Sequence, residues 1–142
     1  MTKAGIWIDH RRAVIVAIDE GEEKTTVLLS AAEKHPERSG DSPMHGRYES
    51  RQVPADDRRQ RVLTKELNVY YDAVVAAVRS VDSLLICGPG EAKGELRRRF
   101  DRKGLGARIA AVETEDKMSD RQFAAKTHQY FAEHAHRVSI IR

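Results

Sequence analysis

A glycine-containing turn between an apolar run and a basic segment is the first candidate for ligand chemistry. The residues LLICGPGEAKGELRRRF occupy 84–100, where Gly90 permits a sharp bend and Lys93 falls in the first turn of an expected helix. Free N–H groups at such a helix start can hold an anion. The P-loop and G-x-G-x-x-G patterns are both absent, and Glu91 and Glu95 would repel a phosphate. The sequence therefore favours a simple strand-to-helix turn, with Gly90 and Lys93 as its candidate anion-binding residues.

Arginines recur along a second segment, which starts near residue 31 and continues into the helix expected after residue 57. A guanidinium group matches a phosphate bidentately, and a neighbouring tyrosine can stack on an unpaired base. Acidic residues in the same segment nearly balance the charge, so a solvated loop is the alternative interpretation. The candidate RNA-binding residues are Arg47, Tyr48, Arg51, Arg58, Arg59 and Arg61.

A carboxylate at the end of the first expected strand is the third candidate. Ribonuclease H-like nucleases place a metal-binding carboxylate at the position of Asp9, and they need several carboxylates around two divalent ions. Glu66 could be a second ligand, but the strands ending at Ser30 and at 87–88 supply none. An aspartate before His-Arg-Arg is more typical of a hairpin turn. The histidines form no ligand motif, so the sequence predicts neither a metal nor a cofactor.

Composition sets broad limits on these possibilities. The chain has 142 residues, a net charge of +3 and a pI near 9.1, which permits contact with nucleic acid without requiring it. Its single cysteine, Cys87, excludes an intramolecular disulfide and a cysteine-based zinc site. The N-terminal residues lack the apolar core of a signal peptide, and no apolar run approaches the roughly 20 residues of a membrane span. We expect a cytoplasmic protein without a membrane partner.

The order of expected elements indicates the fold. Apolar, β-branched runs predict a three-strand meander, after which a proline- and charge-rich stretch at about 31–57 predicts a long loop. Helical and extended patterns then alternate, which predicts an α/β fold of the ribonuclease H-like type, a mixed sheet with parallel later strands, in one domain over 1–142. The expected strands are 4–9, 13–18, 25–30, 84–88, 108–113 and a short edge strand at 137–142; the expected helices are 58–80, 90–103 and 119–134.

Residue patterns within these helices are specific enough to test. Ser119 is the expected N-cap of the last helix, with Gln122 at capping-box spacing. Basic residues at 97–103 gather near a helix C-terminus, where cations offset the helix dipole. The apolar positions expected to line one face of the helix at 58–80 are Val62, Leu63, Leu67, Val69, Tyr70, Ala73, Val74 and Ala77.

Several of these segments together resemble a known protein family. The strand LLICG, a turn of small residues, a lysine and an acidic–leucine pair are similar to the middle domain of eukaryotic and archaeal class-1 peptide-chain release factors and of Pelota. The strand RIAAVE that follows, and the basic helix and loop that precede, fit the same pattern. The opening WIDHRRAVIVAI resembles bacterial relatives known as translational machinery proteins. The resemblance implies a ribonuclease H-like fold and a ribosome or tRNA as partner.

One departure from that family limits what can be carried over. Release factors have a Gly-Gly-Gln tripeptide at the tip of the loop, where it helps a water molecule cleave peptidyl-tRNA. The corresponding stretch here is HGRYESRQVPADDRRQR, which contains no such tripeptide and leaves Gln52 as a weak catalytic candidate. The leading hypothesis is a translation-related factor that contacts RNA without catalysis. The alternatives are a peptidyl-tRNA hydrolase using Gln52, a metal-dependent nuclease around Asp9, or a protein-interaction domain.

Overall fold

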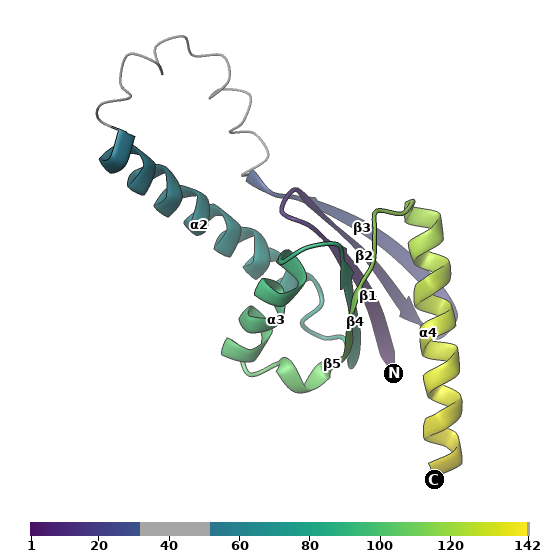
Figure 1. Cartoon of the computed structure of the whole chain (residues 1–142). Coiled ribbons are helices and arrows are strands. Elements are labelled where there is room, and N and C mark those ends of the chain that lie inside the picture. Colours follow the sequence, from purple (N-terminus) through teal and green to yellow (C-terminus); the bar gives the residue numbers. More distant parts are fainter. Residues whose placement is uncertain (32–51, 142) are drawn as a thin grey trace.

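A computed structural model describes residues 1–31 and 52–141, with side chains described for 1–31 and 58–134. Figure 1 shows the chain as a sheet with helices packed against it. In chain order the elements are β1 (Thr2–Ile8), β2 (Arg12–Asp19), β3 (Glu22–Leu29), α2 (Gln52–Ala77), β4 (Ser83–Gly88), α3 (Ala92–Arg102), the 3-10 turn η3 (Gly106–Arg108), β5 (Ile109–Thr114) and α4 (Asp120–Ile141).

The five strands form one mixed sheet in the order β3-β2-β1-β4-β5. The first three strands are antiparallel neighbours, with Ile6 opposite Ile15 in the β1–β2 pair. The later strands are parallel, and Ile6 also lies beside Ile86 of β4. Helical crossovers carry the chain between parallel strands. The expected ribonuclease H-like α/β sheet, a meander followed by parallel strands, is therefore confirmed.

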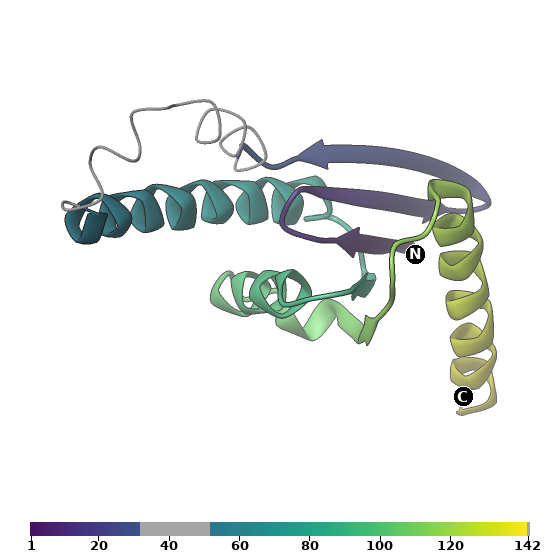
Figure 2. The same ribbon diagram turned by 45° about the horizontal axis from the view of Figure 1, so that its top comes forward.

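Apolar side chains alternate between the two faces of the sheet and divide the core into two clusters. On one face, Ile6, Ile8 and Ile86 pack against α2 and α3. On the other, Trp7 and Cys87 pack against α4. The sheet therefore lies between two helical layers, with α2 and α3 on one side and α4 on the other (Figures 1 and 2). The architecture has three layers.

Two glycines allow close approaches within these layers. A Cβ atom on Gly5 of β1 would lie 2.2 Å from Thr127 Oγ1 of α4, so α4 packs directly on the backbone of β1. A Cβ atom on Gly88 would lie 2.2 Å from the carbonyl oxygen of Ile8. Both distances are far below van der Waals contact, so these sites require the smallest residue.

Helix α2 differs from the expectation at its start and on its surface. It begins at Gln52, so residues 52–57, the end of the expected loop, are helical. The rest of that loop lies outside the described residues. Val62 and Val69 are 50% and 62% exposed, and Ala73 and Ala77 are exposed as well, so these four residues do not belong to the buried face. Tyr70 and Val74 of the expected face are buried, and Tyr71 and Val75 are buried beside them, so the buried stripe follows the i, i+1, i+4, i+5 spacing and continues to Val78 just after the helix.

The later helices confirm one local prediction and correct another. Ser119 and Gln122 form the expected capping box: the Ser119 N–H donates to Gln122 Oε1 at 2.9 Å, and the Gln122 N–H donates to Ser119 Oγ at 3.1 Å. The expected edge strand at 137–142 was wrong, because α4 continues to Ile141. Extending an existing helix adds one hydrogen bond per residue, whereas a new strand needs a free sheet edge within reach. The β-branched composition of these residues did not outweigh that advantage.

Candidate nucleic-acid interface

The first turns of α2 carry three of the predicted RNA-binding residues. Arg58, Arg59 and Arg61, called here the α2 arginines, are exposed. Figure 1 shows that this part of α2 extends beyond the sheet. Because the three positions fall within four consecutive residues, their guanidinium groups spread around one helical turn. The remaining candidates, Arg47, Tyr48 and Arg51, lie outside the described residues.

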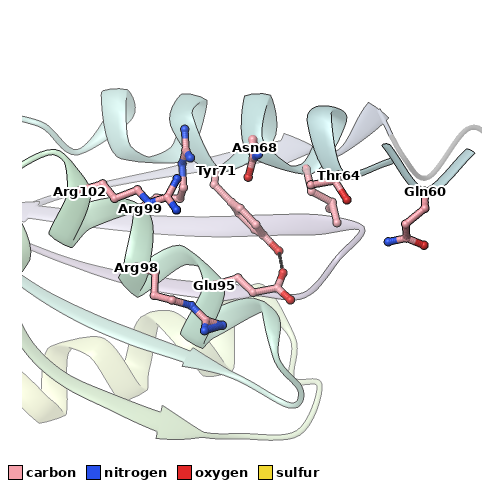
Figure 3. Close-up of a pocket in the computed structure, with 9 residues that line it drawn as sticks. Gln60, Thr64, Asn68, Tyr71, Glu95, Arg98, Arg99 and Arg102 are labelled. Atoms are coloured by element: carbon pink, nitrogen blue, oxygen red, sulfur yellow. Dashed lines mark hydrogen bonds between the residues drawn. The ribbon is translucent and has the colours of Figure 1, made fainter. Parts of the chain in front are cut away.

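A polar groove lies between α2 and α3, with a volume of about 360 Å³ (Figure 3). Residues of both helices line the groove, which runs along the surface where α2 packs beside α3. This feature is called the α2–α3 groove below. Polar side chains from both helices line the groove: Gln60, Thr64, Asn68 and Tyr71 from α2, and Glu95, Arg98, Arg99 and Arg102 from α3.

One carboxylate in the α2–α3 groove is held by two donors. The Tyr71 hydroxyl donates to Glu95 Oε1, as the dashed line in Figure 3 marks, and His10 Nε2 lies 3.1 Å from the same oxygen. Burial raises the pKa of Tyr71 well above its usual range, and the hydrogen bond to Glu95 raises it further. The nearby positive charge of Arg98 opposes this shift. Tyr71 therefore stays a neutral donor that fixes Glu95 at physiological pH.

A second carboxylate neutralises part of the basic cluster on α3. Arg99 donates bidentately to Asp72 of α2, with Nη2 2.8 Å from Oδ1 and 2.9 Å from Oδ2. Lys103 Nζ lies 3.6 Å from the same Oδ1. These two cations therefore join α3 to α2. Within the described part of the chain, neither Arg98 nor Arg102 has a carboxylate at ion-pair distance.

Asp9 serves the turn between β1 and β2. Its Oδ1 accepts hydrogen bonds from the backbone N–H groups of Arg11 and Arg12, both at 2.8 Å. Its carbonyl oxygen accepts from the Tyr70 hydroxyl at 3.0 Å. An aspartate that satisfies two successive N–H groups is the Asx geometry typical of such turns. This local role accounts for the aspartate without a metal.

Among the described residues, no cluster of three metal-binding side chains forms around Asp9. Glu66 lies on α2 beside an apolar groove that Leu29 and Val69 also line. Among the residues whose placement is described, no group of three His, Cys, Asp or Glu side chains could hold a metal ion. Gln52, the other catalytic candidate, is the first residue of α2.

The turn after β4 has the form that the simpler interpretation predicts. Gly88 ends the strand, and α3 begins at Ala92 after Glu91. Lys93 Nζ donates to the carbonyl oxygen of Gly90 at 2.5 Å, so the ammonium group folds back onto the turn. The candidate anion site at Gly90 and Lys93 thus has its lysine engaged in stabilising the turn itself.

Sequence reasoning did not identify the α2–α3 groove as a site. The polar residues Gln60, Thr64 and Asn68 recur every four positions, a spacing that places them on one helical face. Arg98 and Arg102 have the same spacing on α3. These two spacings could have predicted one polar face on each helix. Only the packing of the helices decides that the two faces lie beside one another.

Comparison with known proteins identifies the fold but not a sequence family. No protein-family model matches the chain, and no curated protein matches it in sequence. Solved structures do match, among them Pelota from Thermoplasma acidophilum, with 19% identity over 84% of this chain and a TM-score of 0.51. Pelota from Archaeoglobus fulgidus matches with 11% identity over 90% of this chain and a TM-score of 0.54.

A third similar structure is the archaeal translation termination factor aRF1, with 11% identity over 97% of this chain and a TM-score of 0.50. This chain corresponds to 29%, 31% and 41% of the lengths of those three proteins in turn. The likeness shows a shared fold and agrees with the resemblance to the middle domain of release factors and Pelota. Within residues 1–31 and 52–141, no helix is long and apolar enough to cross a bilayer.

Proposed function

We propose that this domain is a translation-related factor that contacts ribosomal or transfer RNA through the α2 arginines without catalysing a reaction. The observation that carries the proposal is the position of Arg58, Arg59 and Arg61 near the start of α2, which extends beyond the sheet in a fold similar to that of Pelota. Arginine forks suit phosphate oxygens, and exposed cations at a projecting end meet little steric obstruction. Arg47, Tyr48 and Arg51 stay candidate RNA-binding residues on the sequence alone.

Two observations on the catalytic candidates support the non-catalytic part of the proposal. The sequence contains no Gly-Gly-Gln, and Gln52 stands alone between an arginine and a valine. One oxygen of the Asp9 carboxylate, Oδ1, accepts hydrogen bonds from two backbone N–H groups of its own turn. Contact with RNA requires only the charges of the α2 arginines, and a ribosomal or tRNA partner would place the protein in the cytoplasm.

The test is co-sedimentation of the purified chain with ribosomes through a sucrose cushion at about 50 and 200 mM salt, the range over which phosphate contacts weaken markedly. The test variant is Arg58→Ala/Arg59→Ala/Arg61→Ala. Its matched control, Arg97→Ala/Lys117→Ala/Arg121→Ala, removes three exposed cations outside α2. Circular dichroism of all three proteins checks that the helices persist.

We expect salt-sensitive co-sedimentation of the wild type and of the control variant, and its loss in the α2 variant. Three lost contacts to single-stranded RNA would lower the slope of log affinity against log salt by about 2. Failure of the wild type to co-sediment at either salt would refute the proposal. Equal loss in both variants would show that net charge, and not the α2 surface, governs the association.

A further inference from the structure

The two walls of the α2–α3 groove offer different chemistry. On α2, Gln60, Thr64 and Asn68 present neutral donors and acceptors, one per turn (Figure 3). On α3, Arg98 and Arg102 lie one turn apart and contribute positive charge. From Gln60 to Tyr71 the helix rises about 16 Å, at 1.5 Å per residue. The groove therefore has one basic wall and one neutral polar wall along several helical turns.

The charges on the basic wall are available because the neighbouring carboxylates are engaged elsewhere. Asp72 takes Arg99 bidentately and Lys103 at 3.6 Å. Glu95 is held by the Tyr71 hydroxyl and by His10. With these pairs made, Arg98 and Arg102 outnumber Glu95 in the α2–α3 groove, and the local charge is positive. A negatively charged ligand is the complement of such a surface.

We infer that the α2–α3 groove binds a short stretch of single-stranded RNA. Its phosphates lie against Arg98 and Arg102, while its ribose hydroxyls and base edges lie against Gln60, Thr64 and Asn68. Neutral amide and hydroxyl groups read base edges and the 2′-hydroxyl, and RNA is read mostly where it is unpaired. The volume of about 360 Å³ is in the range of small-ligand pockets, which suits a short single-stranded stretch.

This inference rests on the proposed function for the class of ligand, but it concerns a different surface from the α2 arginines. It is tested by fluorescence anisotropy with labelled single-stranded RNA, DNA of the same sequence and the RNA duplex. The test variant is Arg98→Ala/Arg102→Ala. Its control, Arg97→Ala/Arg121→Ala, removes two exposed cations outside the α2–α3 groove.

We expect the wild type and the control to bind single-stranded RNA more tightly than DNA or duplex RNA. The test variant should bind about tenfold or more weakly, with a salt slope lower by about 1.4 for two phosphates. Equal weakening in both variants would overturn the inference, as would stronger binding of the duplex. Arg98→Lys/Arg102→Lys provides a second check, because it should keep the salt slope of the wild type.

A further variant tests the neutral wall separately. Thr64→Ala/Asn68→Ala should reduce the preference for RNA over DNA and leave the salt slope unchanged. An unchanged preference would overturn the assignment of that wall. The outcomes also separate the two proposals. Ribosome association that survives loss of Arg98 and Arg102, with no oligonucleotide effect, refutes only the groove site. Groove-dependent oligonucleotide binding without ribosome association refutes only the proposed function.

Discussion

Replacing Gly5 by alanine should destabilise the contact between β1 and α4 by a definable amount. The new Cβ would lie 2.2 Å from Thr127 Oγ1 and 3.0 Å from Phe123 Cζ. Thr127 is fully buried, and its hydroxyl donates to the carbonyl oxygen of Phe123 at 2.9 Å, so it has little room to move. Overpacking of this kind costs about 1–3 kcal/mol, and the lower chain entropy of alanine offsets about 0.5–1 kcal/mol.

The net loss of unfolding free energy should therefore be about 1–2 kcal/mol, or roughly 3–6 °C in Tm. Urea unfolding followed by circular dichroism measures it. In a Thr127→Ala background the main obstacle is gone, so Gly5→Ala should cost about 0.5 kcal/mol or less. Gly94→Ala is the control: nothing lies within 4 Å of its Cβ in α3, and it should stabilise by about 0.5–1 kcal/mol. An equal cost of Gly5→Ala in both backgrounds would refute the packing argument.

Three further predictions concern single residues. Ser119→Ala removes the capping box of α4 and should cost about 1 kcal/mol in urea unfolding. The fold raises the pKa of Tyr71 above its ordinary 10.0, so the contribution of Tyr71 to the free energy of unfolding is intact below pH 10 and declines as the pH rises beyond it. The Tyr71→Phe variant lacks this titrating group, so above pH 10 its free energy of unfolding should fall less steeply with pH than that of the wild type. Burial raises the pKa of Cys87 to about 12. A thiol reagent at neutral pH should therefore modify Cys87 slowly in the native protein and rapidly in urea. Fast modification of the native protein would contradict the burial of Cys87.

Local patterns explain why the order of elements was predictable. The capping box depends on Ser119 and Gln122, which are three residues apart, and the buried stripe of α3 depends on Ala92, Leu96 and Phe100 at helical spacing. Such signals need no knowledge of distant residues. At the C-terminus the same reasoning failed, because β-branched composition favoured a strand where α4 simply continued.

The surface of α2 shows a different limit. Val62 and Val69 have the apolar character of core residues, but both are exposed, and Val69 lines an open groove with Leu29 of β3. Which side of a long helix is buried depends on the neighbours it meets, and periodicity cannot supply those. Periodicity therefore predicted the helix, although its bounds are Gln52–Ala77 and not 58–80, and it predicted the buried face only in part.

For the candidate sites too, some features were evident from the sequence and others only from the tertiary structure. The sequence by itself determined the meander, the alternation that follows it, the basic character of the first turns of α2 and the absence of Gly-Gly-Gln. Only the tertiary structure brought Asp72 to Arg99 and Tyr71 to Glu95, pairs separated by 27 and 24 residues. Those pairings decide which arginines remain available in the α2–α3 groove. They depend on how α2 packs beside α3 over the sheet, and residues far apart in sequence acquire a common surface only through such packing.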